Sequence, residues 1–332
     1  MRAAVLHAPG DVRVEERAVP EPGPREVLVQ IAAVGVCGSD VHYYEHGRIG
    51  PYVVREPLVL GHESAGRVVA LGPGATRHAA GDRVALEPGV PCGRCRECRA
   101  GRYNLCRDVR FFATPPVDGA FADYVAIHED FAFALPDSVS DEAGALMEPL
   151  SVAVWACRKA GVAPGARVLV TGAGPIGLLT LQVALASGAA AVAVTDVNEH
   201  RLALARRLGA TDRLEDADAL VECSGHPDAL RQGIAALRPA GTAVVVGMGP
   251  EEDATVPLSL IQNRELWLTG TFRYANTYPT AIALAAAGRV DLEAIVTARF
   301  GLDQAEAALR AGREDPAAVK AMVIPGSGTA AP

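Results

Sequence analysis

The feature that most constrains the fold is a glycine pattern directly after an apolar run. Residues 166–174 read ARVLVTGAG, and Gly172, Gly174 and Gly177 complete the spacing GxGxxG. A continuous apolar run is typical of a strand buried on both faces of a parallel sheet. The next segment, PIGLLTLQVALASG, has helical spacing, a proline where a first turn tolerates one and a glycine at its end. This order predicts the first unit of a doubly wound α/β domain.

The same pattern predicts a bound dinucleotide. The glycines permit a tight turn and close approach to a pyrophosphate, and the helix N-terminus offers free N–H groups. Asp196 ends the next strand about twenty residues further on, where a carboxylate binds the ribose hydroxyls and repels a 2′-phosphate. We therefore expect NAD rather than NADP, held by Gly172, Gly174, Pro175, Ile176, Gly177 and Asp196. A structural turn with Asp196 capping a helix is the alternative, and Arg201 either tolerates a phosphate, packs beside the adenosine or is solvated.

The pattern of predicted strands and helices changes near residue 150. Residues 1–150 contain short β-branched runs between glycines and prolines, which predict a closed or partly closed β-domain. From 151 to 288, strands such as AAVAVTD and TAVVVGMG alternate with helical stretches such as EHRLALARRLG, which predicts a Rossmann domain with right-handed crossovers. The tail, 289–332, contains the short strand KAMVIP, which we expect to return to the first domain, and ends in GSGTAAP, which we expect to be frayed.

One connection is unusually short. Only about ten residues, ATDRLEDADA, separate the second helix of the Rossmann domain from the strand ALVEC. A strand and a crossover helix would require on the order of 25 residues. We therefore expect one edge of this sheet to lack a helix, or a helix and a strand.

Charge and hydropathy exclude some classes of function. The net charge is −8 and no basic stretch offers a footprint for phosphates, so we do not expect nucleic acid binding. No apolar segment reaches the roughly 18–20 residues of a membrane helix. The N-terminus, MRAAVLHAPG, has no secretory pattern, so we expect a cytoplasmic protein.

Four of the seven cysteines are crowded into GVPCGRCRECRAGRYNLC. Four thiolates can complete a tetrahedral shell around zinc and leave no open position, as in structural sites. An iron–sulfur cluster is the rival interpretation. We expect a structural zinc bound by Cys92, Cys95, Cys98 and Cys106, and we expect Cys157 and Cys223 to be small buried residues.

Several segments together resemble a known family. These are GVCGSDVHYYEHG, LGHESAGRVVALG, GDRVALEPG, MEPLSVAVWA, GAGPIG and FRYANTYP. They resemble the medium-chain dehydrogenase/reductase superfamily, and most closely its sorbitol (polyol) dehydrogenase branch, over nearly the whole chain. The resemblance implies a GroES-like, β-rich catalytic domain beside the Rossmann domain. The short connection near residues 210–220 departs from the family pattern.

The resemblance also implies a catalytic zinc. Its ligands would be Cys37, His62 and Glu63, with Glu148 reaching the metal directly or through a bound water. Adjacent side chains point in opposite directions on an extended strand, so His62 and Glu63 can both bind one metal only from a turn. Which glutamate is the resting ligand stays open. Zinc as a Lewis acid would activate an alcohol for hydride transfer to the nicotinamide.

The remaining site residues follow from the same resemblance. Ser39 and His42 would relay the proton, with Glu148 and its water as a competing route. Hydrogen bonds from Tyr43, Glu148, Arg273 and Tyr274 would suit a chain of substrate hydroxyls. Phe111 and Phe112 either form a wall of the site or belong to the core. The nicotinamide side would be lined by Val246, Gly247, Met248, Thr271, Phe272 and Arg273.

The predicted function is oxidation of a secondary alcohol of a sorbitol- or xylitol-like polyol to the ketose. The alternatives are L-threonine 3-dehydrogenase or another zinc alcohol dehydrogenase and, in another class, a non-catalytic dinucleotide-binding protein. The last should have lost its ligands, whereas Cys37, His62 and Glu148 are all present. The resemblance further implies a homo-tetramer or homo-dimer, paired through the cofactor domains.

Overall fold

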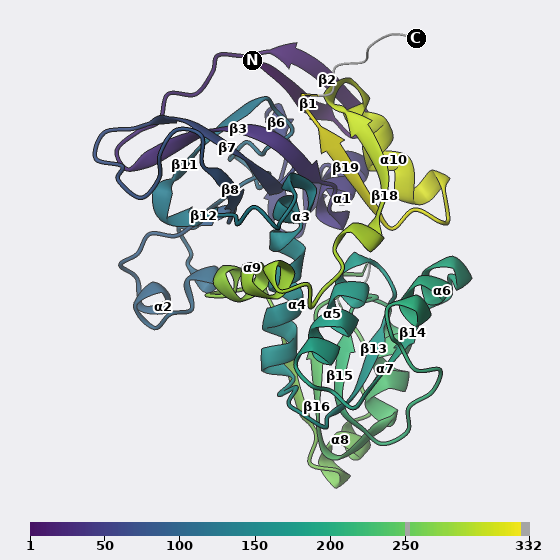
Figure 1. Cartoon of the computed structure of the whole chain (residues 1–332). Coiled ribbons are helices and arrows are strands. Elements are labelled where there is room, and N and C mark those ends of the chain that lie inside the picture. Colours follow the sequence, from purple (N-terminus) through teal and green to yellow (C-terminus); the bar gives the residue numbers. More distant parts are fainter. Residues whose placement is uncertain (250–252, 327–332) are drawn as a thin grey trace. The chain divides into compact units, whose positions relative to one another are not determined.

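The computed structural model describes residues 1–249 and 253–326, and it divides the chain into two compact units (Figure 1). Unit 1 comprises Met1–Glu148 and Val296–Pro332, and unit 2 comprises Pro149–Ile295. The 3-10 helix Glu293–Ile295 is the last element of unit 2, and the chain continues in unit 1 from Val296. Most of the tail GSGTAAP lies outside the described residues.

Unit 1 is built around a seven-stranded sheet. Its order is β12-β8-β7-β3-β19-β18, and β11 also pairs with β3. The apolar, β-branched run of β3 explains why this segment forms a largely buried strand, in which Val27, Val29 and Val34 are fully buried and Gln30 is exposed. The strands are β3 (Glu26–Gly35), β7 (Glu63–Leu71), β8 (Arg83–Leu86), β11 (Tyr124–His128), β12 (Ala132–Ala134), β18 (Val296–Gly301) and β19 (Lys320–Ile324).

Smaller elements complete unit 1. One sheet has the order β2-β1-β6, and two hairpin-like pairs are β4-β5 and β9-β10. These strands are β1 (Arg2–Ala8), β2 (Asp11–Glu16), β4 (Arg48–Ile49), β5 (Tyr52–Val53), β6 (Leu58–Val59), β9 (Gly89–Val90) and β10 (Arg110–Phe111). The helices are α1 (Gly38–His46), α2 (Arg96–Arg99), α3 (Asp141–Ala145) and α10 (Ala305–Glu314), with 3-10 turns at Tyr103–Leu105, Glu129–Phe131 and Leu302–Gln304.

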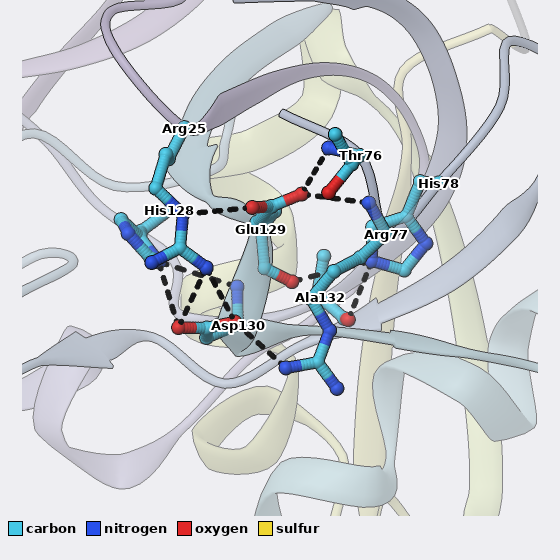
Figure 2. Close-up of polar contacts among 8 residues, drawn as sticks. All are labelled: Arg25, Thr76, Arg77, His78, His128, Glu129, Asp130 and Ala132. Atoms are coloured by element: carbon cyan, nitrogen blue, oxygen red, sulfur yellow. Dashed lines mark hydrogen bonds and ion pairs between the residues drawn. The ribbon is translucent and has the colours of Figure 1, made fainter. Parts of the chain in front are cut away.

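A buried carboxylate fastens a surface loop of unit 1. The oxygens of Glu129 accept hydrogen bonds from the backbone N–H groups of Thr76 and Arg77 at 2.7 and 2.8 Å, and from Nε of Arg25 at 2.9 Å (Figure 2). These contacts lower the pKa of Glu129 to about 2, with the N–H of Arg77 as the strongest cause. Asp130 binds Arg25 and Arg77 beside it. The cluster therefore ties the loop after β7 to the turn after β11.

Unit 2 is the doubly wound domain that the glycine pattern predicts. Its five parallel strands have the order β14-β13-β15-β16-β17, and β13, an interior strand of this sheet, is buried over Val168–Thr171. The strands are β13 (Arg167–Thr171), β14 (Ala191–Thr195), β15 (Ala217–Glu222), β16 (Leu237–Val245) and β17 (Trp267–Gly270). The helices are α4 (Met147–Lys159), which begins in unit 1, α5 (Pro175–Ala186), α6 (Glu199–Arg207), α7 (Pro227–Ala235), α8 (Leu258–Asn263) and α9 (Tyr278–Ala286).

The sheet of unit 2 ends at β14. In the described part of the chain, only an isolated bridge between Ala193 and Thr211 lies beyond that strand. A six-stranded doubly wound sheet would have a further strand there. The short connection therefore removes a strand and its crossover helix, as expected.

None of the helices in the described ranges combines the length and apolar character that a membrane crossing requires.

Candidate metal and cofactor sites

Three of the predicted ligands come together in unit 1. One donor atom each of Cys37, His62 and Glu63 lies within 4.8 Å of the other two. Cys37 precedes α1, and His62 lies between Gly61, whose φ is +85°, and the first residue of β7. The left-handed backbone of Gly61 turns the chain just before His62, and a Cβ there would lie 2.6 Å from the Phe121 ring, so this position requires glycine.

Asp40 orients this group, and the sequence analysis did not identify it. Its carboxylate accepts the backbone N–H groups of Cys37 at 3.0 Å and Gly61 at 2.9 Å. The other contact is with Nδ1 of His62 at 3.4 Å, so Nε2 is the imidazole nitrogen left to a metal. A carboxylate behind a ligating histidine is the usual second partner of a zinc site. The spacing CGSD, which forms a capping box at the start of α1, was the available signal.

Charge is concentrated around these residues. Asp40 is fully buried, which opposes its ionisation, but His62 and the two N–H groups lower its pKa overall. Burial lowers the pKa of His62, and Asp40 and Cys37 outweigh that effect and raise it well above its usual value. Such a set of donors fits a dication that would replace the proton on His62.

A lysine lies beside the same group, and the sequence analysis missed it as well. Lys320, at the start of β19, has its Nζ 2.7 and 2.8 Å from the two carboxylate oxygens of Glu63. Both side chains are buried. The C-terminal strand thus supplies a cation to the ligand group of unit 1.

Glu148 lies outside the group of three. It is buried at the start of α4, and it is close enough to contribute to the raised pKa values of Glu87 and Lys320. Burial raises the pKa of Glu87 to about 7, although the Tyr103 hydroxyl donates a hydrogen bond to it at 2.7 Å. Of the two glutamates considered as ligands, Glu63 is the one positioned with Cys37 and His62.

The other predicted residues of unit 1 lie on or beside α1 and β10. Ser39 and His42 are half-buried, and Tyr43 is buried. Burial and the neighbouring His46 lower the pKa of His42. Phe111 has its ring centroid 5.7 Å from that of His62, so this ring borders the ligand group, and Phe112 belongs to the core cluster.

Cys92, Cys95, Cys98 and Cys106 form a second group with Sγ atoms within 4.8 Å of one another. Two of these separations are 3.4 and 4.0 Å, and sulfur atoms on a tetrahedral zinc are about 3.8 Å apart. The backbone N–H groups of Arg94 and Cys95 lower the pKa of Cys92 to about 6. The group fits a closed four-thiolate shell. All seven cysteines are free, and burial raises the pKa of Cys157 to about 12.

The glycines of the turn Gly172–Gly177 in unit 2 differ in what surrounds them. A Cβ on Gly177 would lie 1.8 Å from the carbonyl oxygen of Gly172, whereas Gly174 has open space before it. Gly174 is the N-cap of α5 and Pro175 its first residue. Asp196 accepts the N–H groups of Ala173 at 2.5 Å and Asn198 at 2.8 Å, which fixes its carboxylate beside the turn.

A further buried glutamate organises the neighbouring loops of unit 2. Glu222, at the end of β15, accepts the N–H groups of Ser224 at 2.7 Å and Gly225 at 3.0 Å, and its carbonyl oxygen accepts those of Val246 and Gly247. Met248 is 72% exposed and Phe272 45% exposed, and the guanidinium of Arg273 lies 4.8 Å from the Phe272 ring centroid. Arg201 and Thr271 are half-buried, and Tyr274 is buried beside Tyr278.

Comparison with known proteins identifies both units. Residues 23–137 match the alcohol dehydrogenase GroES-like domain, and residues 175–287 match the zinc-binding dehydrogenase domain. A sorbitol dehydrogenase of Bacillus subtilis (strain 168) is 43% identical over 98% of this chain and 97% of its own length. That of Gallus gallus is 47% identical over 91% and 90%. L-idonate 5-dehydrogenase of Escherichia coli superimposes with a TM-score of 0.91 at 31% identity, covering 97% of each chain. The chain belongs to the zinc-dependent medium-chain dehydrogenase/reductase family, in its sorbitol dehydrogenase branch.

Proposed function

We propose that this protein oxidises a secondary alcohol of a sorbitol- or xylitol-like polyol to the ketose and transfers the hydride to NAD. The observation that carries the proposal is the group formed by Cys37, His62 and Glu63. Three protein ligands leave one position of a tetrahedral zinc open, which distinguishes a catalytic site from the closed site of four cysteines.

In unit 1, Cys37, His62 and Glu63 would hold the catalytic zinc, and Glu148 would reach it directly or through a water. When bound, zinc supplies the Lewis acidity that makes an alcohol hydroxyl acidic near neutral pH. Asp40 holds the His62 ring so that Nε2 faces the ion.

The proton would leave through Ser39 and His42 on α1. The lowered pKa of His42 keeps its imidazole neutral and able to accept a proton at neutral pH. Glu148 and its water are the competing route. Tyr43, Glu148, Arg273 and Tyr274 would bind the substrate hydroxyls, because buried donors left unpaired by a simple alcohol would be costly.

In unit 2, the turn Gly172–Gly177 and the N-terminus of α5 would bind the pyrophosphate. The fixed carboxylate of Asp196 would accept both ribose hydroxyls and disfavour a 2′-phosphate, which supports NAD. Arg201 would pack beside the adenosine. Val246, Gly247 and Met248, with Thr271, Phe272 and Arg273, would line the nicotinamide side.

The test is NAD reduction by the purified protein across sorbitol, xylitol, simple alcohols and L-threonine, with NADP in parallel. We expect turnover of the polyols with NAD. Turnover of threonine alone would replace the polyol assignment by L-threonine 3-dehydrogenase. Equal use of NADP would contradict the role of Asp196.

A homo-oligomer paired through unit 2 is part of this proposal. β17 is the last strand of its sheet, and on it Trp267 is 72% and Leu268 43% exposed. An edge strand with exposed apolar side chains and unpaired backbone groups is a template for pairing with a second copy. Light scattering should give a dimer or tetramer, and Trp267→Lys should shift it towards the monomer. Seven free cysteines support a cytoplasmic location.

A further inference from the structure

Lys320 is fully engaged with one candidate ligand and one carbonyl. Its Nζ lies 2.8 Å from Oε1 and 2.7 Å from Oε2 of Glu63, and 2.9 Å from the carbonyl oxygen of Val36. An ammonium has three N–H donors, and these three acceptors match them. The Lys320 and Glu63 side chains are 2% and 1% exposed, so water screens the pair little.

The backbone holds both partners in place. β19, which begins at Lys320, pairs with β3 through Met322 and Gly35, and Glu63 is the register partner of that same Gly35 across β3 and β7. A Cβ on Gly35 would lie 2.0 Å from Oε2 of Glu63. The carboxylate therefore lies over bare backbone with the ammonium beside it, and it has little freedom to swing away.

The same carboxylate faces the metal group. One of its oxygens lies within 4.8 Å of the donor atoms of Cys37 and His62. A metal and Lys320 would therefore share Glu63, and each would weaken the hold of the other. Lys320 also adds one positive charge to a buried site, which opposes a dication and makes its surroundings more electron-withdrawing.

The residue type at this position is informative. Two of the 31 cationic residues are lysines, and the other, Lys159 on α4, is exposed. Within residues 1–249 and 253–326, Lys320 is the only lysine or arginine that is buried. An ammonium is a compact point charge with three donors, whereas a guanidinium is a wide planar fork. A chain that uses arginine almost everywhere else thus has lysine at the one position among its described residues where either of the two is buried.

We propose that Lys320 is a positioning residue that keeps Glu63 a weakly bound, exchangeable ligand of the catalytic metal. The ion pair holds the carboxylate at the site while withholding part of its charge. This leaves the open position to the substrate oxygen and maintains a more positive site. The inference rests on the proposed function, since it requires a metal at Cys37, His62 and Glu63.

The test is zinc affinity measured by competition with a chromophoric chelator on the full-length protein. Lys320→Met should bind the zinc of the Cys37 site at least about tenfold more tightly than the unsubstituted protein, while the zinc of the four cysteines is unchanged. Lys159→Met is the matched control and should change neither affinity. Lys320→Arg should not restore the original value. If Lys320→Met fails to fold, Lys320→Gln, which keeps an N–H donor for Glu63, replaces it with the same expectation.

A double-mutant cycle shows whether the effect passes through Glu63. In a Glu63→Gln background, removing Lys320 should tighten zinc binding clearly less than it does when Glu63 is present, because only the direct repulsion between the ammonium and the dication is then removed. Unchanged or weaker zinc binding in Lys320→Met would overturn the inference alone, as would tightening of equal size with and without Glu63. If the unsubstituted protein binds zinc only at the four cysteines, the proposed function fails first, and the inference fails with it.

Discussion

Glu63 and Glu129 are both buried in unit 1, but their surroundings differ. Glu129 accepts hydrogen bonds from two backbone N–H groups and from the Nε–H of Arg25 (Figure 2). Its carboxylate therefore has protein donors on both oxygens. Glu63 has a single cation, Lys320, and shares its pocket with the thiol of Cys37 and the imidazole of His62. A carboxylate with a complete set of donors fastens loops together. One that lies among other metal-binding side chains forms a site that can receive an ion.

Glu87 is a third case in the same unit. Burial raises its pKa to about 7, the nearby charge of Glu148 adds to this, and the Tyr103 hydroxyl donates a hydrogen bond to it. The pKa values of Glu87 and Glu129 thus shift in opposite directions because their partners differ, and burial alone does not predict the role of a glutamate in this unit.

The largest effect should come from the metal group. Cys37→Ser should lower turnover by at least about 1000-fold, since the Lewis acid supplies several kcal/mol of the activation. Metal analysis should fall from about two zincs per chain to about one. Cys223→Ser, a cysteine in neither group, should leave both values unchanged. A variant with one remaining zinc that is lost on Cys95→Ser but retains full activity would contradict the catalytic site.

Glu87→Gln should remove the loss of stability that comes from ionising a buried carboxyl group. Because the folded pKa of about 7 lies above the ordinary value of 4.5, the folded state holds the proton more tightly. The original protein should therefore lose stability as the pH rises from about 4.5 to 7, by roughly 3 kcal/mol in the free energy of unfolding. Urea unfolding at pH 5 and pH 8 should show a smaller difference for Glu87→Gln. The exposed Glu56→Gln is the control, and equal slopes in both variants would refute the assignment.

Asp40→Asn should weaken zinc binding at the Cys37 site about 10- to 100-fold, the usual cost of losing the partner of a ligating histidine. The amide keeps the size of the side chain but loses the charge that orients His62. Chelator competition measures the change. Asp82→Asn, which alters an exposed aspartate that also accepts a backbone N–H, is the matched control. Wild-type zinc affinity in Asp40→Asn would leave Asp40 with a purely structural role.

The smallest effect should come from the hydrogen-bonded cluster of Glu129 with Arg25, Thr76 and Arg77. Glu129→Gln should lower the melting temperature by roughly 2–4 °C, because an amide cannot accept all the hydrogen bonds of the carboxylate. Zinc affinity and turnover should stay at their original values, and a change in either would break the distinction drawn from Glu63.

The stability that Glu129 contributes should also depend on pH in a defined direction. The folded pKa of about 2 lies below the ordinary 4.5, so the stabilisation by Glu129 is present above pH 4.5 and is lost as the pH falls towards 2. Thermal melts between pH 5 and pH 2.5 should show a steeper acid loss in the original protein than in Glu129→Gln.

The features that could be predicted from the sequence are those determined by short, local stretches of the chain. The strand ARVLVTGAG, the glycine turn and α5 follow from period and turn chemistry, and so does the spacing of the four cysteines. The missing edge strand next to β14 was predicted from a length alone, because about ten residues cannot supply a strand and a crossover helix.

Tertiary structure decided how the metal group is assembled. The fold brings Cys37 together with His62 and Glu63, and the register of β19 on β3 brings Lys320 next to Glu63 across 257 positions of sequence. Asp40 gains its role only because Gly61 and His62 return to it. Residue type and local spacing determine which elements form. The pairing of buried charges depends on strand register and desolvation, and these exist only once the chain has folded.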